Sequence, residues 1–174
     1  MDKKLLCYTI AGIVFTSILG TVSHFVYEWS GGNWLAGLFT PVSESTWEHM
    51  KLLFFPMLFY GFFMQFCLKK DYPCISFAYP LGILAGTLAI PVLFYTYTGI
   101  VGRNYTVADI LIFYLSVIFA FTVVYILSQC AKTGNSLLPM LLVLVFAACF
   151  FLFTFFPPKL GVFMPPTSGS NSPQ

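Results

Sequence analysis

The sequence predicts an all-α fold, an integral membrane bundle of five transmembrane helices, and three observations support this prediction. Hydrophobic residues make up 59% of the 174-residue chain and charged residues only 8%, whereas about a quarter of the residues of a soluble protein carry charge. Five apolar runs are long enough to cross a hydrocarbon core, which takes about 20 helical residues. Each run is continuously apolar, which favours helices over the alternating strands of a barrel.

The five predicted spans follow one another inside a single domain, residues 1–157. They cover residues 5–29, 47–68, 76–97, 107–129 and 136–156. Lys3 and Lys4 precede the first run, as basic residues precede a signal peptide, but this run exceeds the ~7–15 apolar residues of a signal sequence. Residues 158–174 are rich in Pro, Ser and Gly, so we expect a mobile external tail.

Two features inside the runs predict how the helices pack. Gly82 and Gly86 lie four residues apart in the third run, and small residues at this spacing let helix backbones approach closely in lipid. Pro56 and Pro91 lie inside apolar runs and are expected to kink their helices.

The distribution of basic residues predicts the orientation. One side of the predicted bundle carries Lys3, Lys4, Lys69, Lys70 and Lys132. Arg103 and Lys159 fall on the other side, so by the positive-inside rule the N-terminus is cytoplasmic and the C-terminus lies outside the cell (inner) membrane. The net charge is only +2, which argues against nucleic acid as a partner. The lipid bilayer is the expected partner. The sequence leaves open whether the chain also forms an oligomer or binds a partner membrane subunit.

The cysteines show no CxxC or Cys/His spacing of a metal site. Four of them, Cys7, Cys67, Cys74 and Cys130, lie near the predicted cytoplasmic ends of spans, and Cys149 lies inside the fifth. We therefore expect reduced thiols that pack as small apolar residues.

Ionisable residues gather at the predicted outer boundary. The stretch PVSESTWEHMK, Pro41 to Lys51, contains two glutamates, a histidine and a lysine. His49 lies 19 residues before Leu68, and His24 lies 19 residues after Leu5, which places both about 28 Å from the inner ends of their helices. Asp109 reaches the same level from the fourth run, so three helices bring ionisable groups to one height.

Local sequence signals surround this level. Ser45 with Glu48 predicts a capping box that begins the second helix, and Thr106 with Asp109 predicts a similar start for the fourth. The preceding loop, SGGNWLAGLFT, combines glycines with an apolar patch. We expect this loop to cover the polar groups as a lid and to form an outward-facing pocket.

The residue types suggest a metal or other cation site. His24, Glu28, Glu48 and His49 offer two imidazoles and two carboxylates, which suit a divalent metal such as zinc. Glu48 and His49 are also the candidate catalytic groups. The candidates for holding an anionic lipid headgroup or phosphate are Lys51, Arg103 and Trp47.

Simpler roles are available for most of these groups. Glu44 and Glu48 suit the first turn of a helix, Lys51 can pair with Glu48 or snorkel to the headgroups, and Arg103 can neutralise Asp109. Two other functions also stay open, a small-solute or proton-linked transporter subunit and a non-catalytic membrane assembly subunit. The residues do not decide whether the protein is an enzyme.

Two segments resemble a known family. HFVYEW followed by GLFTPVSESTWEHMKLLFFPM is similar to the signature of an uncharacterised family of small bacterial multi-span membrane proteins, in which a Pro-Val-Asn/Ser-Glu-Ser-x-Trp-Glu-His-x-Lys segment opens the second helix. The likeness extends over most of the chain, although Ser43 stands where Asn is more usual. The resemblance implies a bacterial membrane protein and no known activity.

Overall fold

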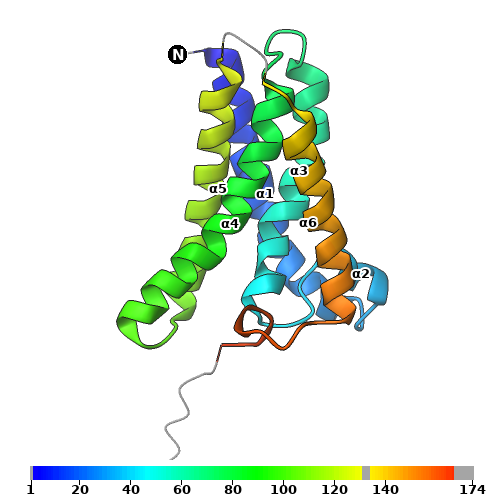
Figure 1. Ribbon diagram of the computed structural model, residues 1–174, viewed down its shortest axis with the longest axis vertical. Helices are drawn as coiled ribbons and strands as arrows, with labels where there is room; N and C mark the ends of the chain where they lie inside the picture. The colour runs from blue at the N-terminus through cyan, green and yellow to red at the C-terminus, as the bar shows by residue number, and fades with distance from the viewer. Residues whose placement is uncertain (1, 131–133, 167–174) are drawn as a thin grey trace, which may run out of the picture.

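The computed structural model describes residues 2–130 and 134–166, and this part of the chain contains helices and no strands (Figure 1). The elements in chain order are α1 (Lys3–Trp29), α2 (Trp34–Phe39), α3 (Thr46–Leu68), α4 (Ile75–Val101), α5 (Thr106–Ser128), α6 (Leu137–Phe155) and a 3-10 turn, η1 (Gly161–Phe163). All except α2 and η1 are long and apolar enough to cross a membrane. The prediction of an all-α chain with five such helices is confirmed, and insertion and orientation stay predictions.

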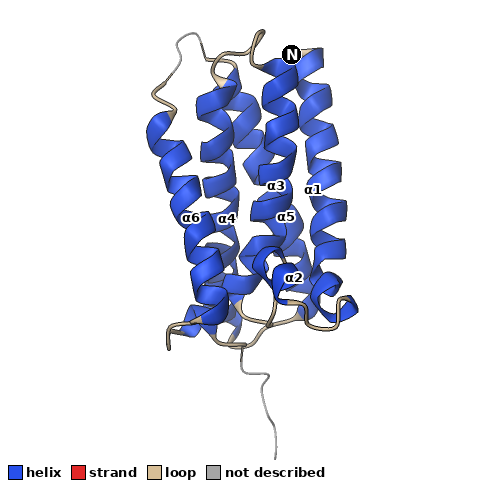
Figure 2. Cartoon of the chain, turned by 90° about the vertical axis from the view of Figure 1, so that its right-hand side faces the viewer, coloured by secondary structure: helices blue, strands red, loops and turns tan. Residues whose placement is uncertain are grey.

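The long helices run alternately up and down and give the bundle two distinct ends (Figures 1 and 2). The lysine end carries Lys3, Lys4, Lys69 and Lys70. The opposite end, called the site end below, carries the N-termini of α3 and α5 together with α2 and η1. Lys132 lies outside the described residues.

α3 is the central helix of the bundle. Within its most apolar segment 61% of residues are buried, against 17% for α6. Phe54, Met57 and Met64 are fully buried core residues, and α1 and α4 pack on either side of α3. α5 packs mainly on α4, and α6 covers α4 from another side. The exposed faces of the outer helices are apolar, as expected for surfaces that contact lipid.

Glycines allow α4 and α5 to pack closely. A Cβ atom added at Gly82 would overlap the Val124 side chain and lie 2.8 Å from the Ala120 carbonyl oxygen. The predicted close approach at Gly82 is therefore present, and its partner is α5. Pro91 lies inside α4, and the part of α4 beyond the middle of the helix leans with α5 away from α3 (Figure 1). Proline removes a helical hydrogen bond and accounts for such a bend.

The two helix starts for which the sequence predicts caps, those of α3 and α5, differ in the structure. Ser45 Oγ accepts a hydrogen bond from the Glu48 N–H at 3.3 Å, so the predicted N-cap residue of α3 is confirmed. The Glu48 carboxylate accepts the Val42 N–H, and the structure therefore shows only the Ser45 half of the predicted capping box. The expected start of α5 is wrong, because its N-cap residue is Tyr105 and makes no side-chain cap. Thr106 is already helical, and the Asp109 carboxylate instead accepts a hydrogen bond from the Tyr97 hydroxyl at 2.5 Å.

Cys74 and Cys130 form a disulfide at the lysine end. The expectation that all thiols are reduced is therefore wrong for this pair, whereas Cys7, Cys67 and Cys149 are free. The two cysteines are 56 residues apart in sequence, and the antiparallel packing of α4 and α5 brings the start of one helix beside the end of the other. This proximity depends on tertiary packing, and cysteine spacing does not reveal it.

Polar contacts also tie the N-terminus to the loop before α4. Lys4 Nζ lies 2.5 Å from Asp71 Oδ2 in an exposed ion pair. A hydrogen bond between the Tyr72 hydroxyl and the Asp2 carboxylate raises the pKa of Tyr72 to about 12 and lowers the pKa of Asp2. These contacts fix the first turn of α1 at the lysine end.

The chain after α6 folds back over the site end. The Phe163 ring lies 4.9 Å from the Trp47 ring of α3 and 5.3 Å from the Phe153 ring of α6. The described part of the predicted tail, up to Pro166, therefore packs on the bundle. Mobility of the tail stays a prediction, and residues 167–174 lie outside the described residues.

Candidate metal site and cavity

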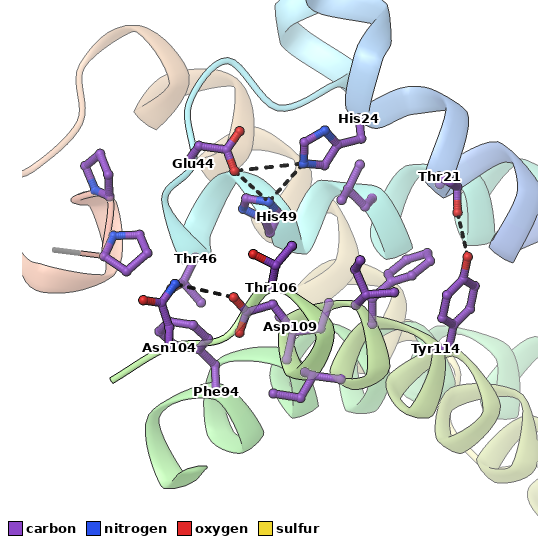
Figure 3. Close-up of a pocket in the computed structure, with 18 of the residues that line it drawn as sticks. Thr21, His24, Glu44, Thr46, His49, Phe94, Asn104, Thr106, Asp109 and Tyr114 are labelled. Atoms are coloured by element: carbon purple, nitrogen blue, oxygen red, sulfur yellow. Dashed lines mark hydrogen bonds and ion pairs between the residues drawn. The ribbon is translucent and has the colours of Figure 1, made fainter. Parts of the chain in front are cut away.

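Two histidines from different helices meet at the site end. His24 lies in the last two turns of α1 and His49 in the first turn of α3, and their Nε2 atoms are 3.3 Å apart. Glu44 comes from the loop before α3, and its Oε2 lies 3.4 Å from His49 Nε2 and 3.9 Å from His24 Nε2. Figure 3 shows the three side chains pointing toward one another.

The distances between these donor atoms match the first shell of a small divalent metal ion. Ligand atoms held about 2.05 Å from a tetrahedral zinc ion are about 3.3 Å from one another. Two of the three separations, at 3.3 and 3.4 Å, agree closely with this value, and the third, at 3.9 Å, is slightly larger. The two imidazoles and the carboxylate can therefore occupy three corners of one coordination shell.

A backbone contact orients His49 for such a role. His49 Nδ1 lies 3.0 Å from the Ser45 carbonyl oxygen, and since a carbonyl oxygen only accepts, Nδ1 carries the proton. Nε2, which faces His24 and Glu44, is then the ring nitrogen that is left to bind a metal. A second-shell carbonyl that accepts from the non-ligating ring nitrogen is a regular feature of metal-bound histidines.

The cluster borders a cavity of about 650 Å³ between α1, α3, α4 and α5. Its polar wall includes Thr46, Asn104, Thr106 and Asp109, and two prolines of the C-terminal segment, Pro165 and Pro166, contribute to its edge. Asn104 and Asp109 lie in Figure 3 on the side of the cavity opposite His24. The prediction that His24, His49 and Asp109 reach one level agrees with their place around this cavity.

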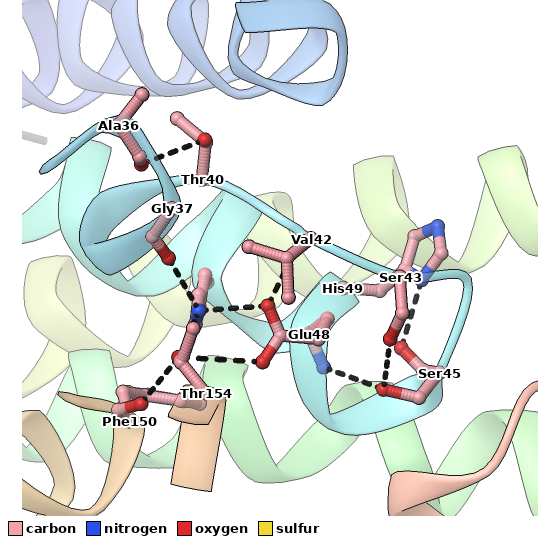
Figure 4. A network of polar contacts seen from close by, with 11 residues as sticks. Ala36, Gly37, Thr40, Val42, Ser43, Ser45, Glu48, His49, Phe150 and Thr154 are labelled. Carbon is pink, nitrogen blue, oxygen red and sulfur yellow. Dashed lines mark hydrogen bonds and ion pairs between the residues drawn. The ribbon is translucent and has the colours of Figure 1, made fainter. Parts of the chain in front are cut away.

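Glu48 and Lys51 make a second, buried set of polar contacts, and Ser45 links this set to His49 (Figure 4). Lys51 is fully buried, and its ammonium group donates to Glu48 Oε2 at 2.7 Å, to the Gly37 carbonyl at 3.0 Å and to Thr154 Oγ1 at 2.5 Å. Glu48 Oε2 also accepts the Val42 N–H at 3.0 Å. The network joins α2, α3 and α6, so the predicted lid segment is held over Glu48 and Lys51 by the Lys51 side chain. The lid was expected to form the pocket, but no residue of α2 is among those that line the cavity beside the histidines.

This network changes the roles expected for Glu48 and Lys51. All three protons of the Lys51 ammonium group have acceptors inside the protein, so Lys51 has none left for a phosphate or headgroup. Glu48 faces Lys51 and not the histidines, because adjacent residues of a helix point about 100° apart. Neither residue lies in the histidine cluster, and their observed role is to hold the lid and α6 against α3.

The other predicted site residues are distributed around the site end. Glu28 is exposed and is not one of the three clustered ligands. Arg103 lies over the Tyr105 ring, 4.7 Å from its centre, and lines a second cavity of about 360 Å³ next to the first. Trp47 packs between the Phe150 and Phe163 rings, so it anchors the C-terminal segment.

Glu44 lies in the charged stretch before the second predicted span, where the sequence suggests for it only a place in the first turn of a helix. Its approach to the histidines depends on the path of the Thr40–Ser45 loop, which helical spacing does not describe. One signal was present, because Glu44 directly precedes the N-cap residue Ser45 and so lies at the end of α3 that carries His49.

Comparison with known proteins gives a family but no function. No curated protein and no solved structure matches the chain. A family model described as "Family of unknown function (DUF6512)" matches residues 2–172. This match includes all five long helices and the cluster of His24, Glu44 and His49, and the chain therefore belongs to that family of unknown function.

Proposed function

We propose that this chain is a multi-pass protein of the bacterial cell (inner) membrane that binds a divalent metal ion, such as zinc, through His24, Glu44 and His49. The observation that carries the proposal is the set of donor separations, 3.3, 3.4 and 3.9 Å, which fit one ion. Two histidines of the predicted ligand set are kept, and Glu44 takes the place of Glu28 and Glu48.

Three protein ligands leave a coordination position for water or a substrate, as in catalytic zinc sites. Here that position would adjoin the cavity of about 650 Å³. A metal ion in this place can polarise a carbonyl or phosphoryl oxygen or activate water. This arrangement supports metal-assisted chemistry at the membrane boundary over a purely structural ion, which is usually enclosed by four protein ligands.

Transport is the second candidate, and buried hydroxyl groups support it. Thr16, Thr87 and Ser116 are buried, and their hydroxyls have no hydrogen-bond partner among the described residues. Each lies about one helical turn deeper than a residue that lines the cavity. If these hydroxyls line a transport path, replacing Thr16 and Thr87 by valine and Ser116 by alanine should reduce solute uptake into proteoliposomes. Metal binding should be unchanged.

The primary proposal is tested by metal binding to the purified full chain in detergent. We expect one zinc ion per chain by elemental analysis, with loss of binding in His24→Ala and His49→Ala. Zinc affinity should also fall from about pH 7.5 to about pH 5.5, because protonated imidazole cannot bind a metal. Absence of zinc from the wild-type protein after incubation with excess metal, or retention of zinc by both variants, would refute the proposal.

A further inference from the structure

Apart from Thr21 and Tyr114, whose hydroxyls bond to each other at 3.1 Å, the lining of the cavity beside the histidine cluster changes from polar to apolar along its depth. On three helices a polar lining residue lies near the site end and an apolar lining residue lies one turn deeper. These pairs are His24 and Gly20 on α1, His49 and Leu52 on α3, and Asp109 and Phe113 on α5. α4 contributes the apolar residues Ile90 and Phe94. A ligand that fills this space needs a polar head at the metal ligands and an apolar chain that extends inward.

The cavity also reaches the lipid-facing surface. Phe25 of α1 and Ile110 of α5 line it, yet they are 44% and 51% exposed. The edge of the cavity therefore lies between Phe25 and Ile110, on the site-end side of the hydrogen bond that joins Thr21 of α1 to Tyr114 of α5, and a bilayer would supply acyl chains there. A volume of about 650 Å³ lies within the range of about 300–1,000 Å³ that holds small ligands.

Arg103 indicates that the polar head of the ligand carries a negative charge. It has no carboxylate within ion-pair distance in the described part of the chain. The second cavity, which Arg103 lines, shares Thr46, Phe94 and Asn104 with the first, so the guanidinium group lies in the cavity next to the one that the histidine cluster borders. Arginine presents paired donors that fit the oxygens of a phosphate.

We infer that the cavity binds a phosphate-bearing bilayer lipid, with one acyl chain between α1 and α5 and the phosphate between Arg103 and the metal site. This inference rests on the proposed function, because the metal ion offsets the negative charge of Glu44 and Asp109 at the same end of the cavity. It adds the ligand class, an anionic single- or double-chain phospholipid.

The test compares two lipids that share one acyl chain. Zinc-loaded full-length protein in detergent is titrated with palmitoyl lysophosphatidic acid or with monopalmitoyl glycerol, which lacks the phosphate, and bound lipid is counted by native mass spectrometry. We expect about 10-fold tighter binding of the phosphate lipid, as one charge-assisted contact provides. Arg103→Gln should reduce this preference, because only the metal ion then attracts the phosphate, and Lys159→Gln, which removes a charge outside both cavities, should leave it unchanged.

A second pair of variants tests the chain site. Ile110→Trp places a larger side chain at the cavity edge and should weaken binding of both lipids by about 10-fold or more. Ile118→Trp makes the same change two turns along α5, where the residue is 48% exposed but does not line the cavity, and should have no effect. Ile110 and Ile118 are both exposed on the surface, so both variants should fold. Zinc binding by each variant checks that it has folded.

The outcomes separate the two proposals. Zinc binding together with equal affinity for the two lipids, or equal effects of the Ile110 and Ile118 variants, overturns the lipid inference and leaves the metal site standing. Failure of the wild-type protein to bind zinc is seen before any lipid is added and overturns the metal site together with the inference that rests on it.

Discussion

Glu44 and Glu28 are exposed carboxylates at the same end of the bundle, but only Glu44 belongs to the cluster with the two histidines. His49 is held there by the Ser45 carbonyl, and the position of Glu44 follows from the loop that leads into the same cap. The role of an ionisable residue here depends on where its side chain ends, and its distance along the helix is a poor guide.

The two glutamates provide a matched test of the ligand set. Glu44→Gln should weaken zinc binding by about 10- to 100-fold, because a neutral amide is a poorer ligand than a carboxylate. Glu28→Gln removes the same charge and should leave the affinity unchanged. Isothermal titration with zinc measures both. A larger loss for Glu28→Gln than for Glu44→Gln would favour the ligand set predicted from the sequence.

Lys51 should contribute more to stability than any surface lysine. Lys51→Met leaves the buried Glu48 carboxylate without its cation, and breaking such a pair costs about 3–5 kcal/mol. Denaturant unfolding of the detergent-solubilised protein measures this change. Lys4→Met breaks the exposed pair with Asp71 and should change stability little.

A double variant shows whether the Lys51 effect arises from the unpaired charge. Glu48→Leu combined with Lys51→Met removes both charges, and apolar replacement of a buried pair is often close to neutral. The double variant should therefore recover much of the stability lost in Lys51→Met. If it is less stable than the single variant, packing around the two side chains, and not the unpaired carboxylate, determines the loss.

At the scale of helices, the spacing between α4 and α5 depends on glycine. Gly82 is buried against Val124 and the Ala120 backbone, whereas Gly99 in the same helix has open space around its Cα. The two residues therefore separate a packing effect from the intrinsic helix propensity of glycine.

Gly82→Ala should destabilise the bundle by about 1–3 kcal/mol, because the added methyl group must displace the backbone of α5. Gly99→Ala meets nothing within 4 Å and should stabilise the helix by about 0.5–1 kcal/mol, as alanine favours the helical conformation. Unfolding in denaturant compares the two. Equal effects of both substitutions would show that α4 and α5 can move apart at Gly82 without loss of stability.

For the whole molecule, two signals at the lysine end disagree. Lys3, Lys4, Lys69 and Lys70 favour a cytoplasmic location, whereas the disulfide between Cys74 and Cys130 at the same end is a bond that persists in oxidising compartments. The site end lies at the opposite side of the bundle (Figure 1). The orientation therefore also decides which compartment the candidate metal site faces.

We expect the N-terminus inside and the C-terminus outside, because the positive-inside rule acts on the short loops of this chain. A periplasmic phosphatase fused to the C-terminus should then be active and a fused green fluorescent protein dark. If the phosphatase fusion is inactive and the green fluorescent protein fusion fluoresces, the orientation is the reverse of the one predicted, and the candidate metal site faces the cytoplasm.

The sequence alone predicted the five long helices, with the largest difference at the end of α4, which extends to Val101 beyond the predicted residue 97. It also predicted that His24, His49 and Asp109 lie at one height along the bundle. These properties depend on the length of apolar runs and on the rise per residue, which are local.

Only the tertiary structure decided which groups meet. It joined Glu44 with the histidines, enclosed Glu48 with Lys51 and paired Cys74 with Cys130. These outcomes depend on the rotation of each helix about its axis and on the path of the loops. Both are determined by close packing between helices that are distant in sequence, and neither leaves a periodic pattern in the chain.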